Sequence, residues 1–143
     1  MHVVGNRVIA KSLEQMADSA SHVALEAQKL KGDGKNVDTK ITKGLLELSD
    51  KVRSLIEDSF NALMKGDLKK SNECIERVGA CEILERSLTA DVMKSVKDVN
   101  LAVGLRSIIW DVGQMARDSV SIAEVGINRK LETPSDFCQW EKV

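Results

Sequence analysis

Residues Leu105–Asn128 read LRSIIWDVGQMARDSVSIAEVGIN, and this stretch has two distinct faces when it is placed on a helix at about 100° per residue. One face is polar and carries Asp111, Gln114 and Asp118, at positions i, i+3 and i+7. A surface helix buries an apolar face and solvates the opposite one, so the stretch predicts one long helix whose carboxylates face solvent. The apolar face consists of Leu105, Ile108, Ile109, Val112, Ala116, Ala123 and Ile127.

Three further segments, residues 6–31, 39–65 and 68–96, repeat apolar residues in a 4-3 rhythm. Glycines and short polar turns separate the segments, and short connections make consecutive helices antiparallel. The sequence therefore predicts one all-α domain over residues 1–143, an antiparallel up-down four-helix bundle. The expected helix caps are Asn6, Asp38 or Thr39, Asp67 and Asp98. The seam expected for the first helix is Ile9, Leu13, Met16, Ala20, Val23, Ala27 and Leu30.

The third helix places Glu85 among the inward-facing residues Cys74, Cys81 and Leu88. A buried carboxylate must be paired or solvated, because its transfer from water is costly. Arg86 and Arg106 are two possible partners, and the sequence does not choose between them.

Composition excludes several classes of protein. The net charge is −1, with no Tyr and two Phe, so neither the basic excess nor the aromatic platform of a nucleic-acid binder is present. No apolar run approaches the roughly 18 residues of a membrane span. Three cysteines, with Cys74 and Cys81 about 10 Å apart on one helix, indicate free thiols in a reducing compartment. A cytoplasmic protein without membrane insertion is expected.

Catalytic signatures are also missing from the sequence. Carboxylate-bridged di-iron bundles need Glu-x-x-His on two helices, and this chain contains no such motif. No glycine-rich phosphate loop and no nucleophile with a matched histidine stands out. The chain is therefore not expected to be an enzyme.

The first and last helices resemble each other. When Asp18 is aligned with Asp118, RVIAKSLEQMADSA lies over SIIWDVGQMARDSV. Glu14, Asp18 and His22 follow one another at i+4 on the first helix. Carboxylates suit hard cations and imidazole suits zinc, iron or nickel, so these three residues form one candidate metal site. The alternative is that they are ordinary solvated side chains.

The segment LLELSDKVRSLIEDSFNALMKGDLKKSNECIERVGACEILERSL (Leu45–Leu88) resembles the first two helices of the PhoU family of phosphate-uptake regulators. The stretch Leu105–Asn128 resembles the third helix, so the likeness covers about residues 39–132. The first helix, SLEQMADSASHVALEA (Ser12–Ala27), resembles the end of a preceding PhoU half. The resemblance is compatible with the chain being part of a longer protein with a DNA-binding module.

The resemblance implies a non-enzymatic regulator of phosphate uptake or signalling, whose partners are phosphate ABC-transporter components or a signalling protein. It also implies two acidic surface motifs, at which some members bind multinuclear metal clusters. The first motif is intact at Glu14 and Asp18. The second has an amide, Gln114, before Asp118, and Asp111 is one turn earlier. The alternative functions are a generic helical interaction bundle and a metal-binding protein of an unrelated pathway.

Trp110, Ile122 and Val125 flank the predicted outer face of the last helix and suggest a homodimer. An exposed Trp110 fits an interface anchor, and it equally fits a residue that the tail covers. The tail contains Phe137 and Trp140, which could fold back on the bundle.

Overall fold

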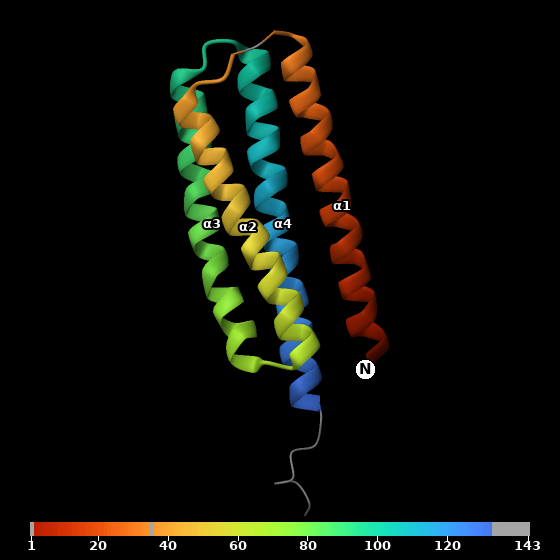
Figure 1. Cartoon of the computed structure of the whole chain (residues 1–143). Helices are drawn as coiled ribbons and strands as arrows, with labels where there is room; N and C mark the ends of the chain where they lie inside the picture. Colours follow the sequence, from red (N-terminus) through yellow and green to blue (C-terminus); the bar gives the residue numbers. More distant parts are fainter. Residues whose placement is uncertain (1, 35, 133–143) are drawn as a thin grey trace, which may run out of the picture.

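A computed structural model describes residues 2–34 and 36–132 of the chain. The elements are the helices α1 (His2–Gly32), α2 (Thr39–Lys65), α3 (Leu68–Ser95) and α4 (Val99–Glu132). They run alternately up and down and pack as a bundle (Figure 1). The predicted all-α, up-down four-helix architecture is confirmed.

Short-range capping sets most of the helix boundaries. Asp38, Asp67 and Asp98 each accept a hydrogen bond from a backbone N–H two or three residues later, at 2.6, 3.0 and 3.0 Å. Gly66 ends α2 in the left-handed conformation, with φ of 63°. These caps satisfy N–H and C=O groups that a helix end leaves free, and they confirm the predicted starts of α2, α3 and α4.

The predicted cap at Asn6 is wrong, because α1 already begins at His2. Asn6 lies inside the helix, and its side-chain oxygen accepts a hydrogen bond from the guanidinium of Arg129 on α4. This asparagine links two helices and does not start one.

Helices α2, α3 and α4 pack against one another and surround the main core. The 4-3 apolar rhythm predicted for the segments that form α2 and α3 is confirmed, and Cys74 and Cys81 lie buried in this core as free thiols. Its most deeply buried large side chains include Ile41, Leu48, Leu55, Val92, Leu105 and Ile109.

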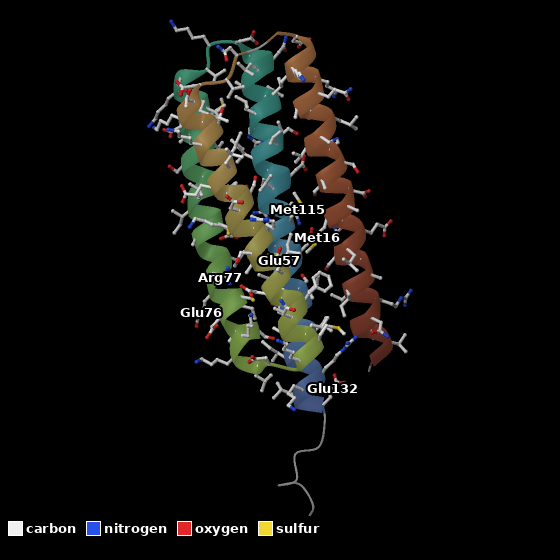
Figure 2. All side chains as sticks on the ribbon, in the orientation of Figure 1. Met16, Glu57, Glu76, Arg77, Met115 and Glu132 are labelled. Atoms are coloured by element: carbon white, nitrogen blue, oxygen red, sulfur yellow. The ribbon has the colours of Figure 1, made fainter. Side chains whose placement is uncertain are left out.

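Helix α1 packs against α4 and, among the described residues, makes no close backbone approach to α2 or α3. In Figure 1 it lies beside α4, on the side away from α3. Met16 of α1 and Met115 of α4 mark the middle of this contact (Figure 2). The buried or half-buried positions of α1 are Gly5, Ile9, Ser12, Met16, Ser19, Val23, Glu26 and Leu30.

The predicted seam of α1 is therefore half right. Leu13, Ala20 and Ala27 are exposed, and Ser12 and Ser19 are buried instead. The 4-3 spacing is correct, but three of the seven predicted positions are off by one residue. At these positions the small or polar residues Ser12, Ser19 and Glu26 face α4 in place of Leu13, Ala20 and Ala27. The two helices approach closely where α4 has no side chain: a Cβ on Gly104 of α4 would lie 3.0 Å from Leu30 of α1.

Helix α4 is the central element, because all three other helices contact it. One side faces the core of α2 and α3, and a second side faces α1. Within the part of the chain that the structure describes, no helix is both long enough and apolar enough to cross a membrane.

Candidate functional site

The face of α4 that carries Asp111, Gln114 and Asp118 is the face that α1 covers. The expectation that these groups point to solvent is wrong, because Asp118 is only 5% exposed. Its Oδ1 accepts a hydrogen bond from Nε2 of Gln114 at 3.4 Å. Its Oδ2 is buried and has no hydrogen-bond partner among the described residues. The packing of α1 thus encloses a carboxyl group that is only half satisfied.

Burial raises the pKa of Asp118 above its ordinary value. The hydrogen bond from Gln114 and the positive charges of Arg117 and Lys11 act in the opposite direction, and burial outweighs them. Desolvation disfavours the ionised form of a carboxyl group. Ionised Asp118 therefore lowers the stability of the α1–α4 contact.

The candidate metal residues are brought together only in part. Nδ1 of His22 on α1 lies 3.3 Å from Oδ2 of Asp111 on α4. One candidate residue of the first helix is therefore in contact with one candidate residue of the last helix. Glu14 and Asp18 are exposed on α1. Among residues 2–34 and 36–132, no three His, Cys, Asp or Glu side chains are grouped as a metal ion would require.

A second polar network joins α3 to α4. Glu85 is 8% exposed, and its Oε2 accepts a hydrogen bond from Arg117 at 2.9 Å. Nε of Arg117 also donates to Oε1 of Gln114 at 3.2 Å, and the guanidinium lies 4.7 Å from the centre of the Trp110 ring. The cation is thus held by a carboxylate, an amide and an aromatic face.

The partner of Glu85 is therefore Arg117, and both Arg86 and Arg106 were wrong as candidates for that role. The carboxylate of Glu85 lies against Gly113 of α4, where an added Cβ would be 2.1 Å from Oε2. The absence of a side chain at Gly113 leaves room for the carboxylate to reach Arg117, one turn further along α4. In the sequence, Arg117 lies seven residues after Trp110 and three after Gln114, which places it on their side of α4 but does not identify Glu85 of α3 as its partner.

The three residues predicted to form an interface have different positions. Trp110 is 51% exposed, whereas Ile122 and Val125 are 0% and 6% exposed. Their expected outward position is wrong, because α1 covers this side of α4: a Cβ on Gly5 of α1 would lie 3.0 Å from Val125. Phe137 and Trp140 lie outside the described residues, so covering of Trp110 by the tail stays a prediction.

The buried polar side chains of this region mainly bind one another. Burial raises the pKa of the Cys81 thiol, which disfavours the reactive thiolate. The carboxylates, amide and guanidinium described above hold one another in place between helices. Trp110 is the half-exposed member of this network.

The fold and these networks define an all-α bundle protein with a central helix and a buried ion pair. A sequence model of the PhoU domain matches residues 45–126, which is more than half of the chain. The chain therefore belongs to the PhoU domain family, as the resemblance predicted. The matched range runs from the first turns of α2 to the last turns of α4 and leaves out α1. No curated protein and no solved structure matches the chain.

Proposed function

We propose that this protein is a non-enzymatic regulator of phosphate uptake or phosphate signalling that acts through protein–protein contacts. The observation that carries the proposal is the PhoU domain match over residues 45–126. The helices that make up this match form the well-packed part of the molecule, and their polar groups are engaged in structural networks.

The proposed partners are the cytoplasmic components of a phosphate ABC transporter or a signalling protein, and the proposed location is the cytoplasm. A regulator of this kind acts by its affinity for a partner in one of the partner's states. Exposed side chains therefore carry the function, and the buried network of Glu85 and Arg117 keeps those side chains in position.

A binding measurement tests this proposal. The purified full chain is titrated onto the ATPase subunit of the phosphate transporter encoded in the same genome, with an ABC ATPase of unrelated specificity as control. Selective binding to the phosphate-transporter subunit, and a change in its ATPase rate, is expected. Equal binding to both ATPases, or to neither, contradicts the role in phosphate uptake and favours a generic interaction bundle.

Metal binding at Glu14, Asp18 and His22 remains a prediction from the family resemblance. Elemental analysis after exposure to iron, zinc or nickel tests it. The Glu14→Ala/Asp18→Ala variant is expected to retain less metal than the unaltered chain, and equal metal content ends the idea. The solution mass of the same sample tests the predicted homodimer. Ile122 and Val125 are buried and therefore no longer favour this prediction.

A further inference from the structure

Three hollows of about 200, 340 and 230 Å³ lie along the surface between α3 and α4, and each shares lining residues with the next. Arg106 lines the first and second hollows, and Glu85 and Arg86 line the second and third. On α4 the groove extends from Val99 to Arg117. At 1.5 Å per residue this is about 27 Å, the length of a helix of about 18 residues. We call this surface the α3–α4 groove.

The α3–α4 groove is apolar at one end and cationic in its middle. Met93, Val99 and Val103 are 63%, 72% and 63% exposed around the first hollow. Trp110 and Arg106 lie in the second hollow, and Trp110 is half exposed. Val99, Val103 and Trp110 lie at positions i, i+4 and i+11 of α4 and form an exposed apolar row. In helix-in-groove complexes, a row of this kind is covered by a helix of the partner.

The positive charge of the groove is only partly balanced. Arg117 is neutralised by Glu85 at 2.9 Å. Arg86 and Arg106 are exposed, and neither forms an ion pair with any residue that the structure describes. Glu82 lines only the third hollow. The middle of the groove thus presents two guanidinium groups beside an indole ring, a combination enriched at protein interfaces.

We propose that the α3–α4 groove binds an amphipathic helix of a partner protein, with an apolar stripe for Val99, Val103 and Trp110 and carboxylates for Arg86 and Arg106. The proposal rests on the proposed function and specifies the chemistry of the partner. Apolar contact supplies affinity, and the two charge pairs set the orientation and accelerate association.

A second copy of the chain fits the groove less well than a partner helix. In a symmetric dimer formed through this face, Arg86 and Arg106 of one copy would lie close to the same cations of the other copy. A separate helix that carries carboxylates does not meet this obstacle.

The test uses the full chain and two synthetic helical peptides of about 18 residues with the same leucine stripe. One peptide carries Glu beside the stripe, and the other carries Lys. Fluorescence anisotropy of labelled peptides is expected to show about tenfold tighter binding of the Glu peptide at low salt, and a smaller difference as salt rises. Equal affinity for both peptides overturns the proposal, as does a response to inorganic phosphate with no response to the Glu peptide.

Variants locate the binding surface. Arg86→Glu/Arg106→Glu is expected to abolish or invert the preference for the Glu peptide, and Trp110→Ala to weaken its binding about tenfold. The matched control is Lys51→Glu/Arg53→Glu, which makes the same change of charge at exposed positions of α2. Equal urea midpoints show that the variants fold. If Arg86→Glu/Arg106→Glu keeps the preference, the groove is not the site.

The two proposals fail separately. If the phosphate-transporter ATPase binds the unaltered chain and the Arg86→Glu/Arg106→Glu variant equally, the groove proposal is wrong and the proposed function stands. If that ATPase does not bind at all, the proposed function is wrong, and the peptide preference still decides what the groove accepts.

Discussion

Replacing Arg117 with Met tests how much the buried ion pair holds α3 to α4. The pair is 2.9 Å long, and the side chains of Arg117 and Glu85 are 28% and 11% exposed. Two unit charges about 4 Å apart attract by about 4 kcal/mol at an effective dielectric constant of about 20. Partial exposure and desolvation reduce this, and a hydrogen bond to a charged group contributes about 1.5–3 kcal/mol. We therefore expect a coupling energy of about 2 kcal/mol.

A double-mutant cycle of Arg117→Met, Glu85→Gln and the double variant measures this coupling by urea denaturation at neutral pH. Arg117→Met alone is expected to cost about 3 kcal/mol, because it also leaves a buried carboxylate unpaired. The control cycle is Arg77 with Asp58, a pair between α3 and α2 whose side chains are 43% and 24% exposed; Figure 2 labels Arg77. Its coupling should stay below about 1 kcal/mol. Equal coupling in both cycles refutes the argument from burial.

Three further predictions concern other parts of the bundle. Asp118→Asn should stabilise the protein at pH 7, and the gain should shrink as the pH falls. The reason is that burial raises the pKa of Asp118 in the folded state. Ionisation of Asp118 as the pH rises therefore lowers the free energy of unfolding, and the asparagine of the variant does not ionise. Urea midpoints at several pH values measure this, and a pH-independent difference contradicts it. Asp67→Ala should cost about 1 kcal/mol by removing the cap of α3; an unchanged urea midpoint would show that this bond is unimportant. In hydrogen exchange, the amides of α1 should lose protection before those of α2, α3 and α4, because α1 packs on α4 alone; equal protection throughout would mean that α1 is fully part of the cooperative unit.

Local sequence signals were enough to predict most of the bundle. Asp38, Asp67 and Gly66 act on backbone groups a few residues away, so their roles follow from chain neighbours alone. The 4-3 rhythm of α2 and α3 was also correct, because the buried residues of each helix recur on one face at helical spacing. Glu85 was correctly placed inside, since the residues at the same helical spacing are Cys81 and Leu88.

The partner of Glu85 depended on how α3 and α4 pack at Gly113. Arg86 is adjacent in sequence, but it lies on the exposed side of α3. Arg117 reaches Glu85 because Gly113 has no side chain between them. A spacing rule within one helix contains no information on this approach, since the two residues are 32 positions apart.

The errors in α1 and α4 have a common cause, which is that helical periodicity does not reveal how many neighbours a helix has. Helix α4 has three sides with different surroundings. One side faces the core, the side of Asp118 faces α1, and the side of Val103 and Trp110 is exposed. A polar residue such as Asp118 suggests exposure to solvent, yet Asp118 is buried on the side of α4 that faces α1. Val103 and Trp110 are large and apolar, yet both are exposed, and for Trp110 this agrees with the predicted outer position. The order of apolar and polar faces is thus partly inverted on α4, and the exposed apolar side is where an additional helix would restore the usual order.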